Sequence, residues 1–292
     1  MRELVVISGK GGTGKTSVAA SLAVLADRPV IADCDVDAAD LHLVFQPVVR
    51  EQNEFYSGHQ AVIRSNTCTG CGKCLSVCRF EAVGRVDTAP GDSVFFIDST
   101  ACEGCGACVR FCPAGAIDFP ERHCGQWMVS DTRVGPMVHG RLGTAAENSG
   151  RLVSLVRSEA RRVAAADNRT NIIIDGPPGI GCPVIASITG STMVLVVTEP
   201  TLSGEHDLKR VMELTSHFQI PTWVAMNKWD INPGITLRVE REAVASGAKL
   251  AGRIRYDPGV TDAQMNGNAV VETDAPSAYD MAQIWENLGF QA

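Results

Sequence analysis

The sequence predicts an α/β fold in which a mainly parallel sheet, covered by helices on both faces, is interrupted by a small α+β insertion. Segments with strand and helix patterns alternate at the start of the chain and again after residue 151, which is typical of a doubly wound sheet. Between these stretches lie eight regularly spaced cysteines. We therefore expect one domain from residues 1–62 plus 121–292 and an inserted domain from residues 63–120.

The alternating segments are recognised by apolar runs and by helical periodicity. Ile172–Asp175 is apolar until its last residue, as expected of a buried parallel strand. Residues 127–143 alternate around a turn at Gly135–Pro136, which indicates a hairpin. We expect its His139 to be packed and its Arg133 to be solvated, and the alternative is that they contact a cluster or a partner. The expected elements are strands at 4–8, 29–32, 172–175, 193–198, 222–227 and 249–254, and helices at 16–26, 151–166, 204–217, 236–246 and 277–288.

Composition excludes several classes of partner. The chain has 292 residues, of which 45% are hydrophobic and 20% charged, and its formal net charge is -7. This charge argues against nucleic acid or an anionic membrane as the main partner. The longest apolar run, Met193–Val197, is far too short to cross a membrane, and the C-terminal helix lacks the basic face of a membrane anchor, so we expect it to pack on the core. A cytoplasmic protein is expected.

The cytoplasm keeps thiols reduced, so eleven cysteines there indicate metal rather than disulfides. Eight of them form two runs with the spacing C-x2-C-x2-C-x3-C, and the residues after each run also repeat, as in an internal duplication. With this spacing, three cysteines of a run ligate one cubane cluster and the fourth ligates the other. The sequence thus predicts two 4Fe-4S clusters, one held by Cys68, Cys71, Cys74 and Cys112, the other by Cys102, Cys105, Cys108 and Cys78.

The alternatives for these cysteines are zinc sites and buried free thiols. The block at residues 63–120 resembles a bacterial two-cluster ferredoxin, which favours the iron-sulfur interpretation. Three cysteines lie outside the runs. We expect Cys34, Cys124 and Cys182 to be ordinary buried or surface thiols, although Cys182 lies in a loop that could face a partner subunit.

The first loop of the chain has the spacing of a phosphate-binding P-loop. Gly9–Thr16, GKGGTGKT, fits G-x4-G-K-[ST] and lies between a predicted strand and a predicted helix, as the mechanism requires. Its glycines allow backbone N–H groups to surround phosphate oxygens, Lys15 reaches the outer phosphates, and the Thr16 hydroxyl takes a magnesium position. The expected nucleotide-binding residues are Gly9, Lys10, Gly11, Gly12, Thr13, Gly14, Lys15, Thr16, Ser17 and, at the end of a later strand, Asn227.

Carboxylates follow two further strands and complete the predicted site. The carboxyl ends of parallel strands meet beside bound phosphates in an open α/β sheet. We therefore expect Asp33 to hold magnesium through water, Asp175 to supply the second magnesium carboxylate, and Asp35 to orient the attacking water. Asp37 and Asp40 are expected to be solvated or capping.

Lys10 is an addition to the generic loop. The run K-G-G-T-G-K-T, the aspartates at 33 and 35 and the later DGPPG run at 175–179 resemble the deviant P-loop ATPases of the MinD/ParA class, which also includes the nitrogenase iron protein. The resemblance implies an ATP-dependent homodimer in which Lys10 reaches the nucleotide of the partner, so that Lys10, Lys15 and Asp35 form the catalytic set. Over its full length the chain resembles MinD-superfamily ATPases that carry an inserted ferredoxin domain.

The sequence leaves alternatives for the nucleotide base and for the purpose of the ATPase cycle. Asn227–Asp230, NKWD, also fits the pattern by which GTPases read guanine, whereas the resemblance favours ATP. The favoured hypothesis is an ATPase whose dimer cycle is coupled to electron transfer to a redox or metal-cofactor protein. The alternatives are a cluster assembly or carrier scaffold, and a positional switch of the MinD/ParA kind with structural or redox-sensing clusters. Related carriers use a CxxC near the C-terminus, and none follows Cys108 here.

Overall fold

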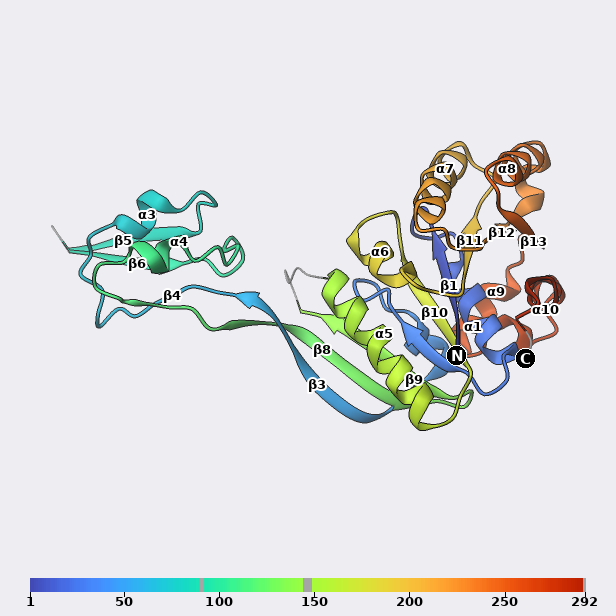
Figure 1. Ribbon diagram of the computed structural model, residues 1–292, viewed down its shortest axis with the longest axis horizontal. Coiled ribbons are helices and arrows are strands. Elements are labelled where there is room, and N and C mark those ends of the chain that lie inside the picture. The colour runs from blue at the N-terminus through green and yellow to red at the C-terminus, as the bar shows by residue number, and fades with distance from the viewer. Residues whose placement is uncertain (90–91, 144–148, 291–292) are drawn as a thin grey trace. The chain divides into compact units, whose positions relative to one another are not determined.

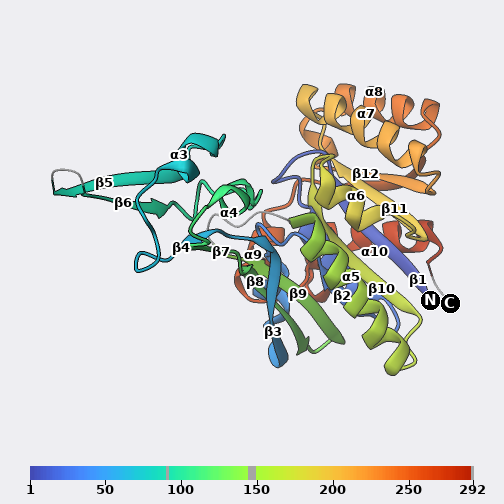
Figure 2. The same ribbon diagram turned by 60° about the vertical axis from the view of Figure 1, so that its left-hand side comes forward.

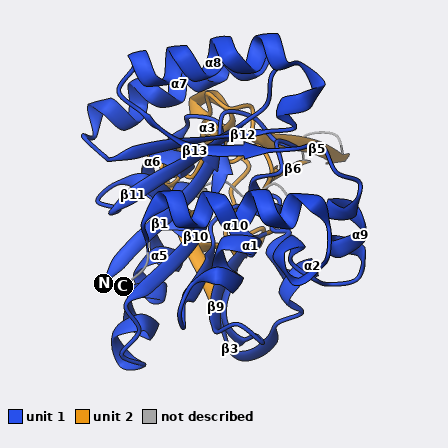
Figure 3. Cartoon of the chain, turned by 90° about the vertical axis from the view of Figure 1, so that its right-hand side faces the viewer, with its two compact units in different colours: residues 1–53, 126–142, 149–292 blue, residues 54–125, 143–148 orange. Residues whose placement is uncertain are grey.

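The computed structural model describes residues 1–89, 92–143 and 149–290. The chain divides into two compact units, one made of residues 1–53, 126–142 and 149–292, the other of residues 54–125 and 143–148 (Figure 3). Residues 63–120, where the sequence predicts an inserted domain, lie within the second unit. Two of the changes of unit, at residues 53–54 and 125–126, occur inside strands.

The first unit is built on a nine-stranded sheet with the order β13-β12-β11-β1-β10-β2-β9-β8-β3 (Figure 1). Neighbouring strands from β13 to β9 are parallel, which confirms the predicted mainly parallel α/β sheet. The strands are β1 (Arg2–Ser8), β2 (Val30–Asp33), β3 (Val48–His59), β8 (Glu121–Asp131), β9 (Pro136–Leu142), β10 (Asn171–Pro178), β11 (Met193–Thr198), β12 (Thr222–Asn227) and β13 (Lys249–Ile254).

The register of the central strands positions the site. β1 and β10 pair with Val6 opposite Asp175, and β10 and β2 pair with Asp175 opposite Asp33. The interior of these strands is apolar and buried because helices cover both faces of the sheet. The carboxyl ends of β1, β2 and β10 therefore lie side by side, and the polar residues that follow them are brought together.

Helices cover both faces of this sheet (Figure 2). α1 and α10 pack with each other and with a core that contains Leu22, Ile173 and Trp285. α5 and α6 pack together against β9 and β10, while α7 and α8 pack on β11, β12 and β13. The helices of this unit are α1 (Lys15–Leu25), α2 (Leu41–Phe45), α5 (Ser149–Ala166), α6 (Cys182–Ile188), α7 (Leu202–His217), α8 (Pro233–Ala245), α9 (Gly259–Met265) and α10 (Pro276–Leu288), with short 3-10 turns at Trp229–Ile231 and Val270–Glu272.

α10 buries Met281, Ile284, Trp285 and Leu288, so the prediction that the C-terminal helix packs on the core is confirmed. In the described part of the chain, none of the helices combines the length and apolar character that crossing a membrane requires.

The second unit contains two short antiparallel pairs and two short helices. β4 (Val62–Ile63) pairs with β7 (Ile117–Asp118), and β5 (Val83–Ala89) pairs with β6 (Asp92–Ile97). The helices are α3 (Lys73–Val77) and α4 (Ala107–Phe111). Phe95, Ile117 and several cysteines form its small core.

The two halves of the second unit repeat one another. Gly72 precedes α3 with φ 70°, and Gly106 precedes α4 with φ 71°, a left-handed conformation that favours glycine. The Ala82 carbonyl accepts a hydrogen bond from Asp98 N–H, and the equivalent Ala116 carbonyl accepts one from Arg64 N–H. The sequence duplication therefore corresponds to a duplicated structure.

Two residues of the hairpin region were the subject of expectations. His139 in β9 is buried and hydrogen-bonded to Ser130, at 2.8 Å from Nε2 to Oγ, so the prediction of a packed histidine is confirmed. Arg133 is exposed, as expected, and it also pairs with Glu272 and donates to the Val44 carbonyl at 2.8 Å. The pairing was not predicted because Glu272 is far away in the sequence.

Candidate functional site

The loop between β1 and α1 has the backbone that a phosphate cradle requires. Gly12 and Gly14 have φ values of 79° and 84°, where side chains introduce strain. A Cβ on Gly14 would also clash with the Asn227 amide, and one on Gly9 would clash with Asp207. The glycines therefore allow both the curved backbone and the close packing of β11–α7 and β12 against the loop.

A buried ion cluster lies at the start of α1. Lys15 Nζ is 2.6 Å from Asp175 Oδ1 and 3.3 Å from Asp35 Oδ2, and the Thr16 hydroxyl donates to Asp175 Oδ2 at 2.8 Å. Burial lowers the pKa of Lys15, but Asp175 and Asp35 outweigh that effect and the pKa is raised. The structure thus brings together four of the predicted residues from three elements.

Asp33 lies deeper in the same cluster. Its Oδ1 accepts from Asp35 N–H at 3.2 Å and its Oδ2 from Leu41 N–H at 3.3 Å, which fixes the loop after β2. Complete burial, and next the charge of Asp175, raise the pKa of Asp33 well above its ordinary value. Burial also raises the pKa of Asp35, with Lys15 opposing. Three carboxylates thus share one ammonium, and a divalent cation would offset the excess negative charge. Asp37 and Asp40 are exposed.

Asn227 is in contact with the loop itself. Its Nδ2 donates to the Thr13 carbonyl at 2.7 Å, and its Oδ1 accepts from Lys228 N–H at 3.0 Å. Its side-chain amide therefore anchors the P-loop to the end of β12. Asp230, the last residue of the NKWD run, accepts with Oδ1 from Tyr256 N–H at 2.7 Å.

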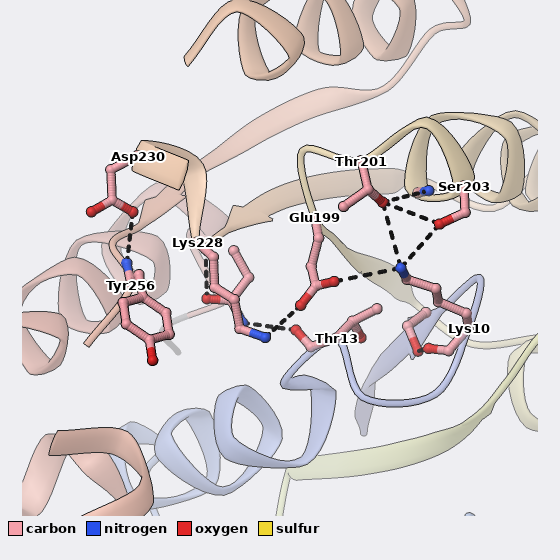
Figure 4. A network of polar contacts seen from close by, with 11 residues as sticks. Lys10, Thr13, Glu199, Thr201, Ser203, Lys228, Asp230 and Tyr256 are labelled. Atoms are coloured by element: carbon pink, nitrogen blue, oxygen red, sulfur yellow. Dashed lines mark hydrogen bonds and ion pairs between the residues drawn. The ribbon is translucent and has the colours of Figure 1, made fainter. Parts of the chain in front are cut away.

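Three residues that complete this neighbourhood were not predicted from the sequence. Glu199 follows β11 and pairs with Lys10 and Lys228 (Figure 4). Gln264 donates from Nε2 to the Ser17 hydroxyl at 2.8 Å, and Asp207 packs against Gly9. No local motif marks them, because each reaches the P-loop through tertiary packing. In the sequence, Glu199 lies in the run TEP, which indicates only the end of a strand. Asp207 lies in the run GEHD, which indicates only the start of a helix.

Two cavities in the second unit are lined by the eight regularly spaced cysteines. With their open mouths included they enclose about 340 and 330 Å³. The remaining lining is mainly apolar and includes Phe80 and Ile97 in the first cavity and Phe95 and Ile117 in the second. The first is lined by Cys78, Cys102, Cys105 and Cys108, and the second by Cys68, Cys71, Cys74 and Cys112.

The cysteines surround these cavities and do not converge on one point. Within residues 1–89, 92–143 and 149–290, no group of three or more His, Cys, Asp or Glu side chains is arranged to hold a metal ion. Burial is the main cause that raises the pKa of Cys74 and of Cys108. The other three cysteines lie elsewhere: Cys34 and Cys124 are buried and Cys182 is exposed. None of these three lines either cavity.

The sequence profile described as "CbiA: CobQ/CobB/MinD/ParA nucleotide binding domain" matches residues 4–270. The chain belongs to this family. The predicted membership in the MinD/ParA superfamily of P-loop ATPases is thereby confirmed. An uncharacterized protein of Methanocaldococcus jannaschii, MJ0578, is 34% identical over 235 residues, which cover 79% of each chain. A second, MJ0579, is 25% identical over 80% of this chain and 83% of its own length.

Solved structures show the same family fold. The cell-division ATPase MinD of Pyrococcus furiosus matches with a TM-score of 0.58 and 17% identity, covering 99% of this chain and 98% of its own. MinD of Pyrococcus horikoshii, solved as a complex with Mg-ADP, matches with a TM-score of 0.59 and 17% identity over 99% of this chain and 96% of its own. McdA of Cyanothece in its apo form matches at 0.59 and 15% identity, over 99% of this chain and all of its own.

Proposed function

We propose that this MinD/ParA-family protein is an ATPase whose nucleotide-dependent dimer cycle is coupled to electron transfer through two 4Fe-4S clusters in the second unit. The observation that carries the electron-transfer half is the division of eight cysteines between two cavities. Each cavity takes three cysteines from one run and the fourth from the other, which is the division that the ligation rule for this spacing requires.

The cavities fit a multi-iron cluster better than a single ion. A single zinc ion requires four ligands at about 2.0–2.3 Å from one point, and none of the described cysteine groups is arranged in that way. The flanking Gly72 and Gly106, both left-handed, let the chain approach the cavity closely. A bound cluster would supply one-electron redox chemistry. The cysteine thiolates of each cavity would hold it, and the apolar lining would limit access of water.

The nucleotide half rests on the P-loop and the buried ion cluster. Backbone N–H groups of residues 9–16 would bind phosphate oxygens, and Lys15 would move from Asp175 and Asp35 toward the outer phosphates. Thr16, Asp175 and, through water, Asp33 would hold Mg²⁺, and Asp35 would orient the attacking water. The Mg-ADP complex of the Pyrococcus horikoshii MinD relative supports this assignment.

ATP is the proposed nucleotide, with GTP as the alternative to be measured. The family supports ATP, since a relative from Borrelia burgdorferi was solved with AMPPNP. The Asn227 amide is engaged with Thr13 and one oxygen of Asp230 with Tyr256, so two members of the NKWD run have structural partners. Competition of ATP and GTP for the same fluorescent nucleotide tests this choice, and a preference for GTP would overturn it.

The proposals of an ATP-dependent dimer and of a partner protein are supported by the same family. Lys10 is proposed to reach the nucleotide bound to a second copy of the chain, and a redox or metal-cofactor protein is proposed to exchange electrons with the second unit. The MinC:MinD complex of Aquifex aeolicus shows that a structural relative binds a partner protein. A positional switch with structural or redox-sensing clusters is the second candidate, favoured by the structural likeness to MinD and McdA.

One experiment tests both halves together. Anaerobically reconstituted protein is expected to contain about eight irons per chain and to hydrolyse MgATP. Lys15→Ala should abolish hydrolysis and leave the iron content unchanged, because Lys15 belongs to the first unit and the cysteine cavities to the second. Zinc in place of iron would overturn the cluster assignment. Hydrolysis that persists in Lys15→Ala would overturn the nucleotide assignment.

A further inference from the structure

Glu199, directly after β11, binds two lysines with one carboxylate. Its Oε1 is 2.6 Å from Lys228 Nζ, and its Oε2 is 3.6 Å from Lys10 Nζ. Figure 4 shows the carboxylate between the two ammonium groups, one from the P-loop and one from the end of β12. The Glu199 side chain is only 13% exposed, and each lysine side chain is 32% exposed. The three charges therefore form one partly buried group.

Hydroxyl groups complete the binding of Lys10 to its own chain. Its Nζ donates to Ser203 Oγ at 3.1 Å and to Thr201 Oγ1 at 3.4 Å. Thr201 is fixed because its hydroxyl also caps α7 by accepting from Gly204 N–H at 3.0 Å. The Lys10 carbonyl also accepts a hydrogen bond from the Ser8 hydroxyl at 2.8 Å.

We propose that Glu199 is a positioning residue that retains Lys10 on its own chain, and that Lys228 sets the strength of this retention by sharing the carboxylate. The inference rests on the proposed function, because retention matters only if Lys10 must leave to reach the nucleotide of a second copy. Ser203 and Thr201 assist Glu199 in holding the Lys10 ammonium.

The relative distances explain how Lys10 can leave at low cost. Removing one partner of a buried pair is expensive when the other charge is left uncompensated. Glu199 keeps its closer partner, Lys228 at 2.6 Å, when Lys10 moves away from its longer contact at 3.6 Å. Without Lys228, the carboxylate would depend on Lys10 alone. Lys228 therefore makes Lys10 easier to release, and it does so through the shared Glu199 carboxylate.

This arrangement predicts opposite effects for the two partners of Lys10. Glu199→Gln should favour the ATP-bound dimer, and Lys228→Met should disfavour it. A partly exposed ion pair is worth up to about a fivefold change in an equilibrium. Because a dimer releases two lysines and the two effects multiply, we expect Glu199→Gln to lower the dimer dissociation constant by up to about 25-fold. In the Glu199→Gln background, Lys228→Met should have no further effect, since it acts only through the carboxylate.

The test uses the full chain and two readouts. Sedimentation with saturating MgATP gives the dimer dissociation constant of each variant. Acetylation of Lys10 in nucleotide-free protein, measured by mass spectrometry against the exposed Lys209, reports retention directly. Glu205→Gln is the matched control: it makes the same charge change on α7, where Glu205 pairs with Arg238 at 2.6 Å from Oε1 to Nε.

Faster Lys10 acetylation in Glu199→Gln, slower acetylation in Lys228→Met and unchanged acetylation in Glu205→Gln are the expected results. Equal acetylation of Lys10 in wild type and Glu199→Gln would overturn the proposal, as would a shift of dimerisation in the same direction by both single variants. Failure of the proposed function gives a different result. In that case the wild type does not dimerise with MgATP, but Lys10 is still acetylated faster in Glu199→Gln than in the wild type.

Discussion

Replacing Cys112 tests the crossed division of the cysteines most sharply. Cys112 follows α4 in the second run, yet it lines the cavity of Cys68, Cys71 and Cys74. Cys112→Ser should therefore damage the site of the first run and spare that of its own run. Loss of one cluster of two lowers the iron content from about eight to about four per chain.

Alkylation shows which cluster is lost. In anaerobically reconstituted Cys112→Ser, Cys68, Cys71 and Cys74 should become reactive toward iodoacetamide, and the four cysteines of the other cavity should stay protected. Cys124→Ser is the matched control, because the buried Cys124 lines neither cavity and its loss should leave about eight irons. Exposure of Cys102, Cys105 and Cys108 instead would refute the crossed division.

Three further predictions concern the first unit. Lys15→Met leaves the buried Asp175 without its charged partner, so the free energy of unfolding of nucleotide-free protein, measured in urea by tryptophan fluorescence, should fall by about 3–5 kcal/mol; a decrease below about 1 kcal/mol would be inconsistent with the pair. Gly14→Ala should abolish nucleotide binding, measured by calorimetry, because its Cβ meets the Asn227 amide; wild-type affinity would contradict this. Burial lowers the pKa of His139 to about 4, so this histidine takes up a proton in the unfolded chain before it does so in the folded protein as the pH falls. Between pH 7 and pH 5 the free energy of unfolding of the wild type should therefore fall by about 2 kcal/mol more than that of His139→Gln. Identical pH dependence in the two proteins would argue against a buried neutral histidine.

The fold was predictable because its central strands carry a strong signal. β1, β10 and β11 are continuous apolar runs that end in polar residues, so their limits differ from expectation by only a few residues. β3 was missed because most of its side chains are exposed and the strand lacks an apolar alternation. α6 and α9, of seven residues each, are too short for helical periodicity.

Of the site, the local motifs were predictable and the tertiary contacts were not. The spacing of Gly9–Thr16 and the strand-end aspartates gave the ion cluster of Lys15, Asp35 and Asp175. Glu199 was not predicted from the sequence, because its ion pairs depend on the packing of β11 and β12, which places it between Lys10 and Lys228. The contact of the Asn227 amide with the P-loop was not predicted, because it requires knowledge of the packing.

Coupling between the two units is the central claim, and an anaerobic redox titration of the reconstituted protein with and without MgATP tests it most directly. If ATP binding and reduction are coupled, each must change the other by the same free energy. We predict that MgATP shifts the midpoint potential by about 60 mV or more, equivalent to roughly tenfold coupling in a one-electron step, and that Lys15→Ala abolishes the shift. Identical potentials with and without MgATP would contradict the coupling.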